Sequence, residues 1–245
     1  ALGALTTVSD LTAVGREALG ANTTGTANTA LGRTALGANT TGASNTAVGY
    51  LSLDANTTAS NNTAMGYAAL GANTTGAGNS ALGESSLDAN TTGSDNVAIG
   101  KGALGANTTA SNNTAVGKDA MLVNTTGTAN VAVGKGAYIA GTTGSNNVAI
   151  GDAALYANTT ADNNTAIGKS ALVANTTGTE NTVIGALAGD AITTGNNNTA
   201  MGHNSLGTNI ISDHNVAIGN DALATHNTGS SIDAYNVAVG SGAGF

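Results

Sequence analysis

The chain has no cysteine, no proline and no tryptophan, and it contains one phenylalanine among 245 residues. Without cysteine there is neither a disulfide framework nor a thiolate metal site. The absence of proline, together with glycines that do not fall at every third residue, excludes a collagen-like triple helix. The scarcity of aromatic side chains argues against a thick globular core and favours a thin core of small aliphatic residues.

Charged residues are also scarce, at 8% of the chain, and the formal net charge is −8. A phosphate-binding surface needs a dense basic patch, so nucleic acid is not expected as a partner. No apolar run approaches the ~20 residues of a membrane span, and no signal peptide is visible. We therefore expect no membrane insertion by this segment.

What the chain has in abundance is a repeat. The motif Asn-Thr/Val-Ala-Val/Ile/Leu/Met-Gly recurs, and its glycine falls at every seventeenth residue from Gly15 to Gly219. Another motif glycine, Gly240, follows after 21 residues, so one repeat carries four extra residues. A fixed short period indicates coils that stack on their neighbours. The strict placement of apolar residues argues against disorder.

Numbering the repeat from its motif asparagine makes Asn28 position 1 and Gly32 position 5. We expect the four extra residues, within Thr225–Tyr235, to form a projecting, mobile or interactive loop. Neither end shows a capping repeat, so we expect a stretch of a longer fibre or a processed fragment. The prediction is one repeat domain, 1–245, with a partial repeat 1–10, regular seventeen-residue repeats 11–214, an irregular repeat 215–235 and a partial repeat 236–245.

The repeat predicts an all-β protein, a parallel β-roll or β-solenoid with seventeen-residue coils. Helix is not expected, because each repeat contains Asn-Thr-Thr-Gly or a variant, which are poor helix formers. Two short strands are predicted in each coil, at positions 1–5, as in Asn147–Gly151, and around positions 8–11, as in Ala154–Ala157. The asparagines of position 12 are expected to stack and to hydrogen-bond from coil to coil.

Alternation along the first strand places positions 2 and 4 on one face and positions 3 and 5 on the other. We favour the small residues of positions 3 and 5 inside the coil, against the leucine of position 9; the reverse arrangement stays open at this point. An apolar stripe of this length is not expected to face water, which predicts that parallel, in-register copies of the chain cover it. The intersubunit core would contain the position-4 residues Ile99, Val116, Val133, Ile150, Ile167, Ile184 and Ile218.

The motif Asn-Val-Ala-Ile-Gly, at residues 96–100, 147–151 and 215–219, resembles the repeat in the head domain of trimeric autotransporter adhesins. It is also similar to repeats of phage tail fibres and other bacterial surface fibres. The resemblance covers essentially the whole chain. It implies a left-handed parallel β-roll, three chains side by side and a role in adhesion. The chain departs from the adhesin head in its longer repeat and its added Asn-Thr-Thr turn.

All six basic residues fall at position 6, a column that also holds two tyrosines and a histidine. One interpretation is a ligand-facing stripe, suited to a host-surface glycan, a protein receptor or an acidic surface. The other is a solvated corner that prevents lateral aggregation of strand edges. The stripe consists of Arg16, Arg33, Tyr50, Tyr67, Lys101, Lys118, Lys135, Lys169 and His203.

No motif points to catalysis, a cofactor or a metal. The histidines lie in different columns, and no Ser-His-Asp arrangement is present. Together with this absence, the resemblance implies a non-enzymatic, extracellular adhesin or tail-fibre segment of a bacterial cell surface or a virion. The alternative is an ice-binding β-solenoid, suggested by the Thr-Thr column, although neighbouring threonines at positions 13 and 14 point in opposite directions. Asn-Thr-Thr also matches the N-glycosylation tripeptide, but a stacked turn is the preferred interpretation.

Overall fold

The computed structural model describes residues 9–225 and 234–244. The chain divides into two compact units, Ala1–Thr126 and Gly127–Phe245, which we call the N-terminal and C-terminal units. The predicted projecting loop falls mainly on residues 226–233, which lie outside the described residues.

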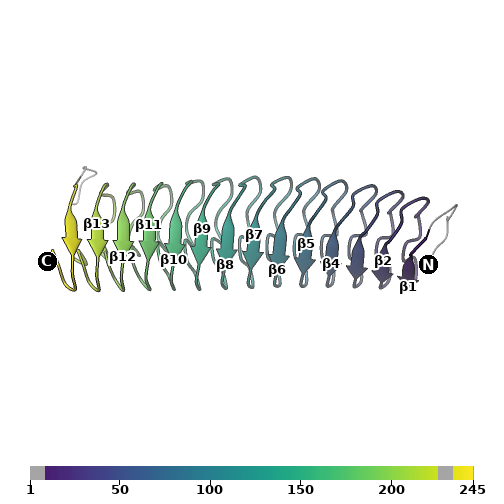
Figure 1. Ribbon diagram of the computed structural model, residues 1–245, viewed down its shortest axis with the longest axis horizontal. Coiled ribbons are helices and arrows are strands. Elements are labelled where there is room, and N and C mark those ends of the chain that lie inside the picture. Colours follow the sequence, from purple (N-terminus) through teal and green to yellow (C-terminus); the bar gives the residue numbers. More distant parts are fainter. Residues whose placement is uncertain (1–8, 226–233, 245) are drawn as a thin grey trace. The chain divides into compact units, whose positions relative to one another are not determined.

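The N-terminal unit is a parallel β-solenoid with one three-residue strand in each coil. Neighbouring strands of this unit pair in parallel, in a register of seventeen residues (Figure 1). The strands are β1 (Thr12–Val14), β2 (Thr29–Leu31), β3 (Thr46–Val48), β4 (Thr63–Met65), β5 (Ser80–Leu82), β6 (Val97–Ile99) and β7 (Thr114–Val116).

The C-terminal unit repeats this architecture. No helix occurs in either unit over the described residues, and the predicted parallel β-solenoid with seventeen-residue coils is confirmed. The last strand pair has a register of 21 residues because of the insertion. The strands are β8 (Val131–Val133), β9 (Val148–Ile150), β10 (Thr165–Ile167), β11 (Thr182–Ile184), β12 (Thr199–Met201), β13 (Val216–Ile218) and β14 (Val237–Val239).

The small residue of each strand faces the inside of its coil. Ala98 and Ala149, for example, are fully buried, whereas the residues on either side of them are half-buried or exposed. The leucines of position 9, such as Leu104 and Leu155, are fully buried and fill the coil. The favoured arrangement of faces is therefore confirmed, with alanine inside and positions 2 and 4 outside.

The second predicted strand, around positions 8–11, is wrong. In the coil of β9 this segment is a turn, because Ala153 and Leu155 adopt φ values of 55° and 53°, in the left-handed region. A strand needs extended backbone at each residue. The turn still bonds to the next coil, since the Leu155 N–H donates to the Ala171 carbonyl at 2.9 Å and the Ala157 N–H to the Val173 carbonyl at 3.1 Å.

The motif glycine ends the strand because only glycine fits there. Gly32 has a φ of 143°, and a Cβ on it would overlap the carbonyl oxygen of Gly49 in the next coil. A side chain is excluded both by backbone conformation and by the close approach of stacked coils. This double constraint explains the regular recurrence of glycine at position 5.

Two columns of buried asparagine side chains join successive coils, and we call each column a ladder. In the position-12 ladder, the Asn73 side-chain amide donates to Asn56 Oδ1 at 3.0 Å and to the Gly76 carbonyl at 2.9 Å, and Asn73 Oδ1 accepts from Asn90 at 2.9 Å. In the position-1 ladder, backbone N–H groups donate to the asparagine one coil earlier, as in Asn62 N to Asn45 Oδ1 at 3.0 Å. The predicted asparagine stacking is therefore confirmed.

Among the described coils of the C-terminal unit, two replace both the leucine of position 9 and the asparagine of position 12. In one, Tyr138 and Gly141 take these positions, and the buried Tyr138 hydroxyl donates to the Gly144 carbonyl at 3.2 Å, the acceptor an asparagine normally occupies. In the other, Gly189 and Ile192 take them, and the fully buried Ile192 side chain lies against the space that leucine fills elsewhere.

Candidate functional site

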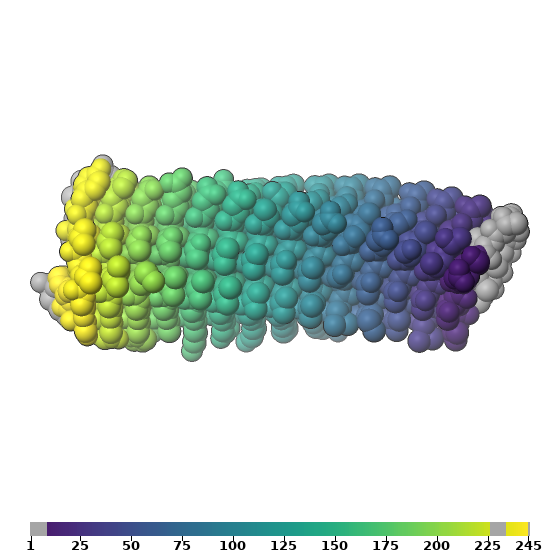
Figure 2. Space-filling view, viewed as in Figure 1, coloured from purple at the N-terminus to yellow at the C-terminus, as the bar shows by residue number. Residues whose placement is uncertain are grey.

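The outward strand face consists of positions 2 and 4 of the coils. Its residues are Thr, Ser, Val, Leu, Ile and Met, so it carries no charged side chain. Several large apolar side chains on it are exposed, including Val14 at 56%, Met65 at 42% and Met201 at 39%. Strand pairing repeats these side chains from coil to coil at roughly 4.8 Å, and successive coils form continuous rows within each unit (Figure 2). Each unit therefore presents a regular apolar surface.

The residues predicted for an intersubunit core all end their strands on this face. Ile99, Ile150 and Ile218 are exposed, at 39%, 37% and 37%. The other four predicted residues are half-buried: Val116, Val133, Ile167 and Ile184. The structure thus leaves every predicted interface residue at least partly accessible.

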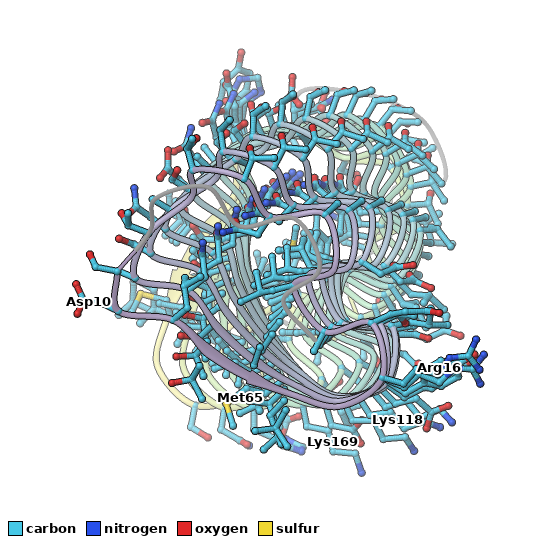
Figure 3. All side chains as sticks on the ribbon, turned by 90° about the vertical axis from the view of Figure 1, so that its right-hand side faces the viewer. Asp10, Arg16, Met65, Lys118 and Lys169 are labelled. Carbon is cyan, nitrogen blue, oxygen red and sulfur yellow. The ribbon has the colours of Figure 1, made fainter. Side chains whose placement is uncertain are left out.

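The corner column is position 6, in the turn that directly follows each strand. Viewed along the coils, Arg16 and Lys118 project from this turn, next to the strand face on which Met65 lies (Figure 3). All nine residues of the predicted stripe are exposed. The fold aligns Arg16, Arg33, Tyr50, Tyr67, Lys101 and Lys118 within the N-terminal unit, and Lys135, Lys169 and His203 within the C-terminal unit.

Three members of the corner column contact one another over consecutive coils. The Arg33 guanidinium lies 5.3 Å from the centroid of the Tyr50 ring, a cation–π distance. The Tyr50 and Tyr67 ring centroids are 5.8 Å apart, with an interplanar angle of 54°. This cluster offers exposed aromatic and cationic groups to a ligand such as a glycan.

Most other charges of the N-terminal corner column are neutralised locally. Arg16 pairs with Glu17 at 3.2 Å, Lys101 with Glu84 at 2.9 Å and Lys118 with Asp119 at 3.4 Å. These pairs are exposed, so each contributes little to stability. Neighbouring carboxylates therefore offset most of the positive charges, and the column is not a continuous positive surface.

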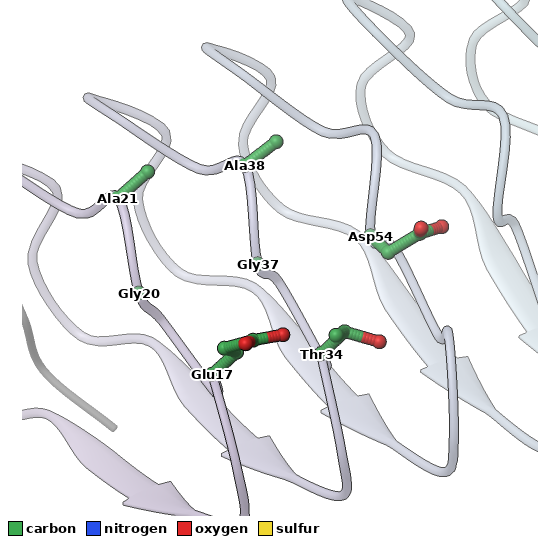
Figure 4. A pocket seen from close by; sticks show the side chains of 7 residues that line it. All are labelled: Glu17, Gly20, Ala21, Thr34, Gly37, Ala38 and Asp54. Atoms are coloured by element: carbon green, nitrogen blue, oxygen red, sulfur yellow. The ribbon is translucent and has the colours of Figure 1, made fainter.

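A shallow hollow of about 440 Å³ lies on another face of the N-terminal unit (Figure 4). Gly20 and Gly37 line it, together with the carboxylate residues Glu17 and Asp54. Burial raises the pKa of the Asp54 carboxyl, and hydrogen bonds from its own and the following backbone N–H oppose this effect. Sequence reasoning missed this hollow, although glycine and alanine at positions 10 and 11 of consecutive coils could have indicated it.

The described residues contain no group of three or more His, Cys, Asp and Glu side chains that could hold a metal ion. None of them belongs to a helix long and apolar enough to cross a membrane. No family model, curated protein or solved structure matches the chain. The resemblance of the motif to adhesin and tail-fibre repeats therefore stays a prediction, and the surfaces described above carry the functional argument.

Proposed function

We propose that the chain is a non-enzymatic segment of an extracellular fibre, an adhesin or a tail fibre, which spaces or presents a binding surface on a bacterial cell or a phage. In this proposal three copies associate in parallel through their outward strand faces. The observation that carries it is the exposed, uncharged strand face, which repeats through every coil of each unit.

Association follows from the energetics of that face. Burial of apolar surface contributes about 25 cal/mol per Å², and contiguous apolar patches of more than a few hundred Å² are rare on monomers. Because the coils repeat with one spacing, a parallel copy can place like coils at the same height along the whole face. Closed cyclic symmetry then covers the face of every copy, and three copies agree with the resemblance of the motif.

Light scattering tests the assembly. We expect the wild-type chain to have three times the mass of one chain, and the variant Ile150→Asp/Ile167→Asp to dissociate or unfold, because it would bury carboxylates between apolar side chains. The matched control is Thr160→Asp, at an exposed residue outside the outward strand face. A folded wild-type monomer at high protein concentration would contradict the trimer.

The Arg33–Tyr50–Tyr67 cluster is proposed to contact a host-surface glycan or protein receptor. Beads coated with the assembled protein test this on immobilised glycans and on cells. The variant Arg33→Ala/Tyr50→Ala/Tyr67→Ala is expected to lose retention, and Thr24→Ala/Thr41→Ala, on another exposed column, is expected to keep it. If beads carrying either variant are retained equally, the cluster does not bind the glycan or receptor, and only the role of the fibre segment as a spacer remains.

Ice binding is the less supported alternative. The position-13 threonines are half-buried and their hydroxyls are engaged, as when Thr23 Oγ1 donates to the Thr40 carbonyl at 3.0 Å. Of the two adjacent threonines in each coil, only the one at position 14, such as Thr24, is exposed. Clear thermal hysteresis at micromolar protein would reverse this ranking.

A further inference from the structure

The tripeptide Asn-X-Thr, which asparagine-linked glycosylation requires, occurs in two columns of the solenoid. In the first column it begins at position 12, as in Asn73-Thr74-Thr75. Asn73 is fully buried, and its amide nitrogen donates to Asn56 and Gly76 within the ladder. A transferase cannot reach such a nitrogen without unfolding the coil.

The second column begins at position 17, one residue before the ladder asparagine of position 1. Its asparagines are exposed, and each is held by its backbone alone; the Asn61 N–H, for instance, donates to the Ala43 carbonyl at 3.1 Å. Within the described residues their side-chain amides make no hydrogen bond. The complete tripeptides begin at Asn61 and Asn112 in the N-terminal unit and at Asn163 and Asn197 in the C-terminal unit.

The fold does not demand asparagine at position 17. These four residues have φ values of 57° to 63°, a region that favours asparagine among the non-glycine residues. However, Ala27, Ser44 and Glu180 occupy the same position with φ values of 54° to 59°. The backbone conformation alone therefore does not account for the four tripeptides.

The threonine of each tripeptide is also within reach of an enzyme. It occupies position 2, the first residue of the strand, and belongs to the outward strand face. Thr63 is exposed, and Thr114, Thr165 and Thr199 are half-buried. An enzyme can therefore contact both the acceptor amide and the hydroxyl while the coil stays folded.

We propose that Asn61, Asn112, Asn163 and Asn197 are acceptors for sugar transfer from a nucleoside diphosphate sugar. The side-chain amide nitrogen attacks the anomeric carbon, a C–N bond forms as the bond from that carbon to the diphosphate oxygen breaks, the nucleoside diphosphate leaves, and the amide proton passes to a base of the transferase. Asn61 and Asn112 lie three coils apart, roughly 14 Å at ~4.8 Å per coil, which gives each sugar its own space on the edge of the unit.

The test uses the purified full-length chain, UDP-glucose and a soluble asparagine glucosyltransferase that accepts folded proteins, with the modified sites mapped by peptide mass spectrometry. We expect a hexose on the four asparagines and none on the buried asparagines of position 12. The chain contains its own control in Asn146, which is exposed with a φ of 59° but is followed two residues later by Val148. Asn146 is expected to stay unmodified.

Two reciprocal variants separate the tripeptide from the general accessibility of the column. Thr63→Val is expected to abolish modification of Asn61, and Val148→Thr to create modification at Asn146. Both threonine and valine occur at position 2 in other coils, so neither change should disturb folding, and circular dichroism checks this. A synthetic peptide spanning Asn73-Thr74-Thr75 is expected to be modified, which would show that burial protects this asparagine in the protein.

The proposal stands apart from the proposed trimer, although partner chains could cover the threonines of the strand face. The reaction is therefore run on the wild type and on Ile99→Asp, after light scattering has shown that this variant is a monomer and circular dichroism that it is folded. Modification of the four asparagines in either protein supports the proposal. Absence of modification in both, under conditions that modify a peptide of residues 59–65, overturns it. Equal modification of the position-12 asparagines in the folded protein also overturns it.

Discussion

The two units differ in the continuity of their position-12 ladders. In the N-terminal unit, amide hydrogen bonds link every coil from Asn22 to Asn107. In the described part of the C-terminal unit, Gly141 and Ile192 interrupt the column. The two interruptions also differ from each other, because Tyr138 supplies a hydroxyl in place of the missing amide and Ile192 supplies only apolar volume.

The difference shows that positions 9 and 12 behave as one packing unit. A large residue at one position goes with a small residue at the other, so the volume inside the coil is conserved. The hydrogen bonds are conserved less strictly. Asn175, directly before the coil of Ile192, has an Oδ1 atom without a hydrogen-bond partner, and an unsatisfied buried polar atom costs about 1–3 kcal/mol.

The largest effect is expected on converting the Tyr138 coil into a regular one. Tyr138→Leu alone should lower the free energy of unfolding by about 2–4 kcal/mol. The Gly144 carbonyl loses one of its two side-chain donors, the Asn147 amide loses the tyrosine hydroxyl as an acceptor, and the missing ring leaves a cavity. Gly141→Asn alone should also destabilise, since a Cβ there overlaps the Tyr138 ring. The double variant should recover to within about 1 kcal/mol of wild type, because the new amide can donate to Gly144 and accept from Asn158.

Urea unfolding of the four proteins gives the coupling free energy of the two sites. We expect it to be at least about 2 kcal/mol in favour of the matched pairs. If the double variant loses as much stability as the two single variants together, positions 9 and 12 are not coupled.

A smaller effect should distinguish a continuous from an interrupted ladder. Asn73→Ala removes a side chain with three ladder hydrogen bonds, so we expect a loss of about 3 kcal/mol. Asn175→Ala removes a side chain that donates only to the Gly178 carbonyl, at 2.9 Å, and should cost about 1–2 kcal/mol. Calorimetry of the two variants compares their losses in the free energy of unfolding. Equal losses would show that the asparagines stabilise the coil by packing and that the hydrogen bonds between coils add nothing.

The smallest effect concerns pH. Burial raises the pKa of the Asp54, Asp88 and Asp190 carboxyls, with backbone hydrogen bonds opposing it. The folded state therefore holds these protons more tightly than the unfolded state, whose carboxyls titrate near pH 4. Their contribution to stability is fully present below that pH and is lost as the pH rises through the raised pKa values.

Asparagine substitutions test this pH dependence in both units. Asp54→Asn/Asp88→Asn should flatten the fall in stability above about pH 4 more than Asp190→Asn does, because two of the three groups lie in the N-terminal unit. Unfolding midpoints measured across the acidic range give the comparison. If the stability of the double variant falls more steeply with rising pH than that of the wild type, the direction assigned to these pKa shifts is wrong.

Much of this fold could be predicted from the period alone. Alternation within Val148-Ala149-Ile150 placed alanine inside, and the asparagine column indicated a ladder. The turn at positions 7–11 could not be predicted, because nothing in the residue type shows that Leu155 adopts a φ of 53°, a region that non-glycine residues seldom enter. That conformation comes from closing a seventeen-residue coil and packing leucine inside it.

The candidate surfaces were predicted less completely. The corner column could be found because all basic residues share position 6, but its ion pairs depend on side-chain geometry. The exchange between Tyr138 and Gly141 was present in the sequence as two separate irregularities. Only the structure shows that they belong together, since the tyrosine hydroxyl reaches the carbonyl of Gly144.

Both ladders of the N-terminal unit have a direction. In each, the donor lies in the later coil and the acceptor in the earlier one, as in Asn39 Nδ2 to Asn22 Oδ1 at 2.7 Å and Asn45 N to Asn28 Oδ1 at 2.9 Å. Every ladder therefore offers an acceptor oxygen toward the C-terminal side and donors toward the N-terminal side. Two such stacks meeting at their C-terminal sides would bring acceptor against acceptor. A further coil can therefore join either end of a ladder only head to tail, with the same polarity.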